Sequence, residues 1–205
     1  MKKCLILFGE YRGRREAIEW DSENLPNDWD SILSTWNSTN TYPHEDLTFS
    51  DTKHRTIIEP YKETHDISLY ASFAMCNRII KALESINEDY EYIVIKRLDL
   101  LWKDVFTYIS DSQNKIWVEG GDDEWFDGEW LNDYIFVGQK DELLHLFKSS
   151  YDYIENNNPP RNINGEPNVH HFWYKMIEKY ISHEPIELFS NKNSNYKLLT
   201  RNLKD

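Results

Sequence analysis

The sequence predicts an α/β fold with a mostly parallel central sheet that is flanked by helices on both faces. Runs typical of strands alternate with runs typical of helices through the first two thirds of the 205-residue chain. Residues 92–95 form a β-branched apolar run that breaks abruptly into charges, as a central buried strand does. Residues 66–83 carry apolar side chains at three- and four-residue steps, which is typical of a helix packed on one side.

The elements follow one another in chain order. Residues 4–8 are an apolar run bounded by Gly9, which predicts a buried strand that turns into a first helix. Asp66 is a suitable cap for the long helix, and the Asn, Pro and Gly of residues 155–167 predict a loop. The expected strands are residues 4–8, 29–36, 56–58, 92–95, 115–118, 134–137, 186–189 and 196–199. The further expected helices are residues 141–154 and 167–181.

Charge and cysteine content exclude several classes of function. The chain has 36 acidic and 23 basic residues, a net charge of −13 that argues against DNA or RNA as a partner, although a single nucleotide remains compatible. Cys4 and Cys76 are too few for a disulfide scaffold or a cysteine zinc cluster. No apolar stretch approaches the ~18 residues of a membrane span and no signal segment opens the chain, so we expect a cytoplasmic protein.

Ligands of parallel α/β sheets bind in the crevice beyond the carboxyl ends of the strands, so the residues after each strand are site candidates. Gly9 permits a close backbone approach after the first strand, and Arg12 can grip a phosphate with two hydrogen bonds. The turn has neither a Rossmann glycine fingerprint nor a P-loop, so an ordinary turn is about as good an interpretation as a binding loop.

A charged segment, Lys96, Arg97 and Asp99, ends the buried strand at 92–95. Charges at such a place are costly unless they face solvent, a metal or a partner. In an extended chain Arg97 and Asp99 share a face, so Asp99 can bind a divalent cation beside an arginine that neutralises phosphate. An internal salt bridge that locks the strand end is the alternative, and the residues alone leave both open.

Residues 120–138 combine acidic, aromatic and glycine residues. A solvated acidic loop is the default interpretation of residues 120–129. Asn132 and Asp133 differ because they directly precede an apolar strand, where they can bind sugar hydroxyls or, for Asp133, act as a general base. The histidines show no metal-ligand spacing, and neither a Gly-x-Ser-x-Gly elbow nor a convincing Cys–His pair is present, which argues against a nucleophilic hydrolase.

Four motifs in this order resemble glycosyltransferases of GT-A type found in bacterial polysaccharide clusters, phages and large DNA viruses. They are Gly9-Glu10-Tyr11-Arg12, the stretch DSILSTW that ends at Trp36, the strand YEYIVIKRLDLLW that contains Asp99, and the strand NDYIFVG that begins at Asn132. The resemblance spans residues 3–201. The chain departs from the family pattern in having Ile95 where an arginine is common, Glu10 where a small or amide residue is commoner, and no Asp-x-Asp at the strand end that contains Asp99.

The resemblance implies a single GT-A domain, with a nucleotide-binding half at residues 1–103 and an acceptor half at residues 104–205. It implies a nucleotide-sugar donor such as a UDP-sugar, a glycan or other hydroxyl acceptor, and a cytoplasmic location, which is the host cytoplasm for a viral protein. Asp99 would hold Mn²⁺ or Mg²⁺, and Asp133 would be catalytic. The donor would be bound by Gly9, Tyr11, Arg12, Trp36, Arg97 and Asn132. The alternatives are an inactive carbohydrate- or nucleotide-binding module and a nucleotidyltransferase.

Overall fold

The computed structural model describes residues 2–10, 15–37, 54–60, 67–98, 100–102, 117–120, 131–156, 176, 188–190 and 196–198. The strands are β1 (Lys3–Glu10), β2 (Trp29–Asn37), β3 (His54–Pro60), β4 (Ile93–Arg97), β5 (Leu100–Trp102), β6 (Trp117–Gly120), β7 (Leu131–Gly138), β8 (Leu188–Ser190) and β9 (Tyr196–Leu198). The helices are α1 (Arg15–Asn24), α2 (Ile67–Glu84) and α4 (Lys140–Asn156).

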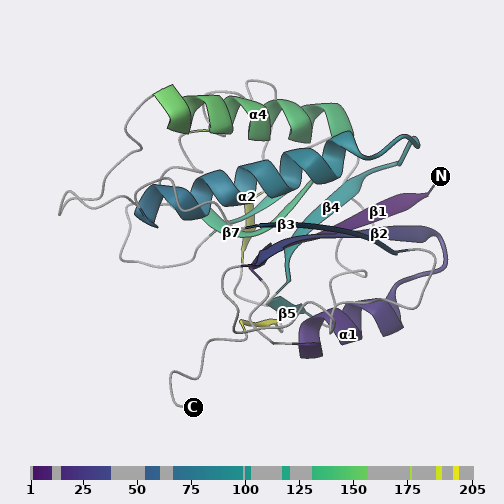
Figure 1. Cartoon of the computed structure of the whole chain (residues 1–205). Helices are drawn as coiled ribbons and strands as arrows, with labels where there is room; N and C mark the ends of the chain where they lie inside the picture. Colours follow the sequence, from purple (N-terminus) through teal and green to yellow (C-terminus); the bar gives the residue numbers. More distant parts are fainter. Residues whose placement is uncertain are drawn as a thin grey trace, which may run out of the picture.

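A seven-stranded mixed sheet lies at the centre of the protein, with the order β3-β2-β1-β4-β7-β6-β8 (Figure 1). Strands β1 to β4 are parallel to one another. Strand β7 is antiparallel to β4 and β6, and β8 is parallel to β6. The predicted α/β class with a mostly parallel sheet is therefore confirmed, and β7 runs against its neighbours.

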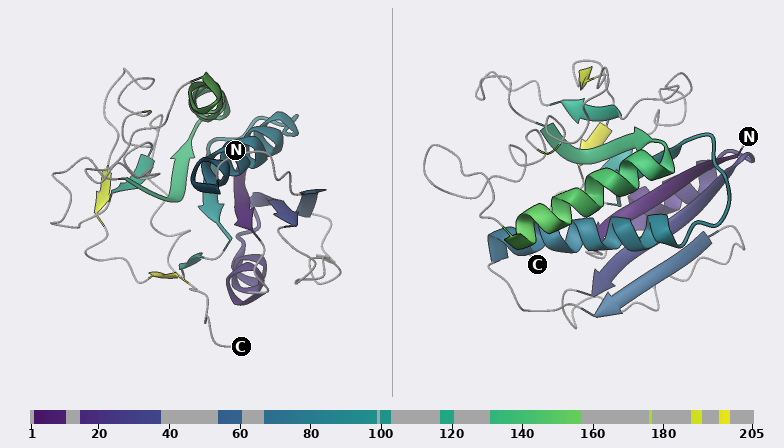
Figure 2. Two further views of the ribbon diagram at one scale, coloured as in Figure 1. Left: turned by 60° about the vertical axis from the view of Figure 1, so that its left-hand side comes forward. Right: turned by 90° about the horizontal axis from the view of Figure 1, so that it is seen from above.

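Helices cover both faces of this sheet, as the sequence predicts (Figures 1 and 2). Helix α1 lies on one face, where Ile18 packs with Leu33 of β2 and Val94 of β4. Helices α2 and α4 lie side by side on the other face, where Ile79 and Phe147 belong to one core cluster. Among the described helices none is long and apolar enough to cross a membrane.

Strand β1 is buried on both of its faces. Cys4, Ile6 and Phe8 join the core under α2 and α4, whereas Leu5 and Leu7 join the core under α1. All five side chains are at most 4% exposed. Since successive side chains of a strand point to opposite faces, an unbroken apolar run is what a strand between two helical layers requires.

The layer of α2 and α4 is closed by aromatic and aliphatic packing. The rings of Phe136 on β7 and Phe147 on α4 meet edge to face, with centroids 5.1 Å apart at 73°. Cys76 and Leu83, both expected on the apolar side of the long helix, are fully buried on α2. Neither Cys4 nor Cys76 forms a disulfide, and burial raises the pKa of the Cys76 thiol.

Some expectations differ from the structure or lie outside its described part. The short strand β5 was not expected; it follows β4 almost directly and pairs antiparallel with β9 in a separate two-stranded sheet. Helix α4 continues to Asn156, so the expected loop does not begin at residue 155. Of the expected helix at residues 167–181 the structure describes Met176, which is helical and buried. The remainder of that helix and the Asp66 cap lie outside the described residues.

Candidate functional site

The carboxyl ends of four parallel strands meet at one edge of the sheet, here called the carboxyl edge. Gly9 on β1 is opposite Thr35 on β2, and the next pair in register is Glu10 and Trp36. On the other side of β1, Arg97 at the end of β4 is opposite Phe8. The backbone therefore brings the predicted positions Gly9, Trp36 and Arg97 together.

The start of β7 lies at the same edge because β7 is antiparallel to β4. Lys96 pairs with Ile135, so the residues that precede Ile135 continue beyond it toward the carboxyl edge. Asn132 and Asp133 are among them, and the structure describes their backbone but not their side chains. Tyr11, Arg12 and Asp99 lie outside the described residues.

The gap between β1 and β4 at this edge is a topological switch point. From β1 the chain passes through α1 to β2 on one side, whereas from β3 it passes through α2 to β4 on the other side. The two connections leave the sheet in opposite directions, and in open α/β sheets such a point forms the crevice that binds ligands. Gly9 and Arg97 lie at the ends of the two strands that flank it.

Gly9 has a backbone conformation that other residues rarely adopt, with φ at +125°. A Cβ atom built at this position would meet Leu98 Cγ at 3.7 Å and Cδ2 at 3.8 Å, which are ordinary contacts. The Gly9 carbonyl also accepts a hydrogen bond from Thr35 Oγ1 at 2.6 Å. Glycine is therefore required here by the dihedral angle and not by a lack of space.

Strand β4 ends at Arg97, because Leu98 lies in a turn and its amide donates a hydrogen bond to the Phe8 carbonyl at 2.9 Å. The alternation that would place Arg97 and Asp99 on one face applies only to an extended chain. Because Asp99 lies outside the described residues, the expectation of a shared face stays a prediction. Arg97 itself is half-buried and lies, by register, on the same side of the sheet as Ile95 and helix α2.

An internal salt bridge near this strand end joins Lys96 to Asp21, whereas a pair between Arg97 and Asp99 stays untested because Asp99 lies outside the described residues. Lys96 is fully buried, and its Nζ lies 2.6 Å from Oδ2 and 2.9 Å from Oδ1 of Asp21 on α1. Burial raises the pKa of the Asp21 carboxyl, and the charge and hydrogen bond of Lys96 oppose this rise. Sequence reasoning missed Asp21, although its spacing of three from the buried Ile18 places it on the apolar side of α1.

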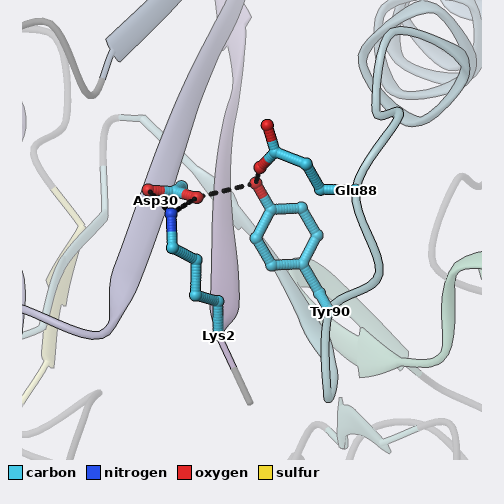
Figure 3. Close-up of polar contacts among 4 residues, drawn as sticks. All are labelled: Lys2, Asp30, Glu88 and Tyr90. Carbon is cyan, nitrogen blue, oxygen red and sulfur yellow. Dashed lines mark hydrogen bonds and ion pairs between the residues drawn. The ribbon is translucent and has the colours of Figure 1, made fainter.

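A second polar cluster, formed by Lys2, Asp30, Glu88 and Tyr90, lies at the amino-terminal edge (Figure 3). The Tyr90 hydroxyl is 2.9 Å from Asp30 Oδ2 and 2.7 Å from Glu88 Oε2, and Lys2 Nζ is 3.1 Å from Asp30 Oδ2. Asp30 opens the stretch DSILSTW, whose other end reaches the carboxyl edge. The stretch DSILSTW thus spans the sheet along β2, and Asp30 contributes polar contacts at the amino-terminal edge, opposite the carboxyl edge.

The protonation of this cluster follows from its hydrogen bonds. Burial acts to raise the pKa of Asp30, but the hydrogen bonds from Tyr90 and Lys2 outweigh it and hold that pKa below the ordinary value of 3.8. Burial and the two carboxylates raise the pKa of Tyr90. Because the phenol has one proton, it donates to one carboxylate at a time.

Neither comparison with known proteins identifies the chain. No protein-family model matches it, and a comparison with curated protein sequences found no significant match. The fold therefore defines a class only: an α/β protein with a mixed, mostly parallel sheet and a topological switch point between β1 and β4. Within the described residues, no three His, Cys, Asp or Glu side chains are grouped so that they could hold a metal ion.

Replacing Gly9 tests the conformation of the β1 end. Gly9→Ala is expected to lower the free energy of unfolding by about 1–3 kcal/mol, the usual cost of a strained backbone angle. Urea denaturation at 25 °C measures this loss, with Glu23→Ala on the exposed side of α1 as a control that should change little. An unchanged free energy of unfolding for Gly9→Ala would show that the turn relaxes to a negative φ.

The cluster at the amino-terminal edge has a pH dependence of known sign. A carboxyl whose pKa is lower in the folded state stabilises that state above the unfolded-state pKa of about 3.9, and this contribution disappears as pH falls through the folded-state value. Asp30→Asn is therefore expected to cost about 1 kcal/mol at pH 7 and progressively less below pH 4. Urea denaturation of the wild type and of Asp30→Asn at pH 7 and below pH 4 measures the difference in the free energy of unfolding. A larger loss at the lower pH would contradict a lowered pKa of Asp30 in the folded state.

Proposed function

We propose that the protein is a metal-assisted glycosyltransferase of GT-A type that moves a sugar from a nucleotide-diphosphate sugar to a hydroxyl of a glycan or other acceptor in the cytoplasm. One observation carries the proposal: the backbone brings Gly9, Trp36, Arg97, Asn132 and Asp133 to one edge of the sheet, around a switch point. The order of the four motifs is the ground for the class of reaction, and a UDP-sugar is the first donor to test.

An anionic donor requires local positive charge, because the whole chain carries a net charge of −13. Arg97 ends the strand on one side of the switch point. Arg12 follows three residues after Gly9 on the other side. Each guanidinium group can make paired, charge-assisted hydrogen bonds to phosphate oxygens, so in this proposal the two arginines hold the diphosphate.

A divalent cation fits the chemistry of the side chains that lie in or next to these strand ends. Glu10, Asp99, Asn132 and Asp133 all carry oxygen atoms, the ligands that Mg²⁺ and Mn²⁺ prefer. In this proposal Asp99 holds the ion, which when bound stabilises negative charge on the departing nucleotide diphosphate. Glu10, at the last residue of β1, is a further carboxylate whose backbone lies at the same edge of the sheet.

Asp133 is the proposed catalytic base. Its backbone belongs to the first residues of β7, between Leu131, which pairs with Gly120 of β6, and Ile135, which pairs with Lys96 of β4. A carboxylate at this place can take the proton of the acceptor hydroxyl as the new glycosidic bond forms. Asn132, one residue earlier, would then hold a sugar hydroxyl, and the acceptor would approach from the side of residues 122–133.

A thermal-shift screen tests the proposed function directly. UDP-, GDP- and CDP-sugars, free UDP and nucleoside triphosphates are each added with and without Mn²⁺, and a true donor at about 100 times its Kd should raise Tm by about 5–10 °C for a chain of this size. Stabilisation by UDP only in the presence of metal supports the transferase. A response to no nucleotide supports a carbohydrate-binding module instead, and a response to nucleoside triphosphates supports a nucleotidyltransferase.

Asp99→Asn is expected to abolish the part of this shift that depends on metal, because an amide is a weaker ligand than a carboxylate for a hard cation. The control is Asp152→Asn on the exposed side of α4, which changes the net charge equally and should respond as the wild type does. If Asp99→Asn retains the full metal-dependent shift, the metal is not bound by Asp99.

Asp133→Asn is expected to reduce turnover by about 10²–10⁴-fold while leaving the donor Kd unchanged, because asparagine keeps the shape but cannot accept the proton. Release of UDP from the donor, with added glycan or water as acceptor, gives kcat, and titration of the donor gives Kd. A loss of only a few-fold combined with weaker donor binding would assign Asp133 to sugar recognition.

A further inference from the structure

Lys96 connects three separate elements at the carboxyl edge. It lies on β4 with no exposed side-chain surface, and its ammonium contacts both carboxylate oxygens of Asp21 on α1. The same ammonium donates a hydrogen bond to the Leu100 carbonyl, at the first residue of β5, at 2.7 Å. One buried cation therefore joins a helix, a strand end and the segment that follows the strand.

These contacts fix the backbone on both sides of residue 99. On one side the Leu98 amide donates to the Phe8 carbonyl of β1 at 2.9 Å. On the other side the Leu100 carbonyl accepts from Lys96. The first contact ties the turn to the strand that carries Gly9, and the second ties it to α1 through Asp21, so the ends of this short turn have little freedom to move.

Stability alone does not explain a buried ion pair at this position. Removing two charges from water is costly, and replacing such a pair with apolar residues of similar volume is often neutral or stabilising. The surroundings of Asp21 are mostly apolar, because Leu5, Leu7, Ile18 and Leu33, together with Ser22 and Ser31, line a small cavity beside it. What an apolar pair does not replace is the hydrogen bond to Leu100.

We propose that Lys96 is a positioning residue: held in place by Asp21, its ammonium fixes the Leu100 carbonyl and thereby sets the backbone of the turn between β4 and β5 at the crevice. The consequence for Asp99, which is bonded to Leu98 and Leu100 in the chain, rests on the proposed function. Lys96 itself touches neither donor nor metal in this proposal.

The decisive variant is the double replacement Asp21→Leu with Lys96→Met. It removes both charges together, and the leucine extends into the small cavity beside Asp21. We expect its Tm to stay within about 5 °C of the wild type, whereas Lys96→Met alone leaves a buried carboxylate without its cation and should lower Tm by about 10 °C. Ile18→Val, one turn away on α1, is the control that keeps the ion pair.

Two measurements on the double variant separate positioning from a purely structural role. Amide hydrogen exchange followed by mass spectrometry should be at least tenfold faster in the peptide that covers residues 98–102, and unchanged in residues 93–96 of β4. Titration with Mn²⁺ in the presence of UDP, followed by thermal shift, should give an apparent metal affinity at least tenfold weaker. Ile18→Val should match the wild type in both measurements.

The outcomes are distinguishable from one another. A double variant with wild-type stability, wild-type exchange at residues 98–102 and wild-type metal affinity overturns the positioning role and leaves the proposed function standing. A double variant that does not fold also overturns it, because the ion pair would then be a requirement of the fold itself. If the wild type binds neither Mn²⁺ nor UDP, the proposed function fails, and the exchange measurement still decides whether Lys96 holds the turn.

Discussion

The burial of β1 on both faces is the constraint on which the architecture depends. Its side chains alternate between two cores, so helices must lie above and below the sheet. The chain meets this demand by placing α1 on one face and α2 on the other, which sends the two connections in opposite directions. The switch point between β1 and β4 therefore follows from covering one apolar strand on both faces. It does not depend on which ligand or reaction the site serves.

The charged groups at the two ends of the sheet differ in their exposure to water. At the amino-terminal edge Asp30 is partly exposed and contacts Lys2 and the Tyr90 hydroxyl, which also lies within hydrogen-bond distance of Glu88. At the carboxyl edge Lys96 is withdrawn completely from water and is matched by a single carboxylate on α1. The first arrangement leaves Asp30 in contact with water, whereas the second fixes one geometry, because a buried charge that loses its partner is strongly unfavourable.

The sequence predicts the parts of this structure that depend on periodicity. Alternating layers and the amphipathic face of α2 follow from apolar spacing, and their positions agree with the structure within a few residues. The pairing of Lys96 with Asp21 could not be predicted, because it depends on where α1 crosses the sheet. The antiparallel direction of β7 could not be predicted either, because an apolar run does not indicate whether a strand is parallel or antiparallel to its neighbours. This direction brings Asn132 and Asp133 to the carboxyl edge.

Both cysteines belong to the core under α2 and α4, one at the centre of the sheet and one on the helix that covers it. Neither thiol is accessible in the folded state, and burial disfavours the thiolate of Cys76. Each sulfur atom therefore becomes reactive only when the layer around it opens. The rates at which a thiol reagent labels Cys4 and Cys76 would report on the opening of this shared core at β1 and at α2, so the native chain carries its own pair of probes for local unfolding.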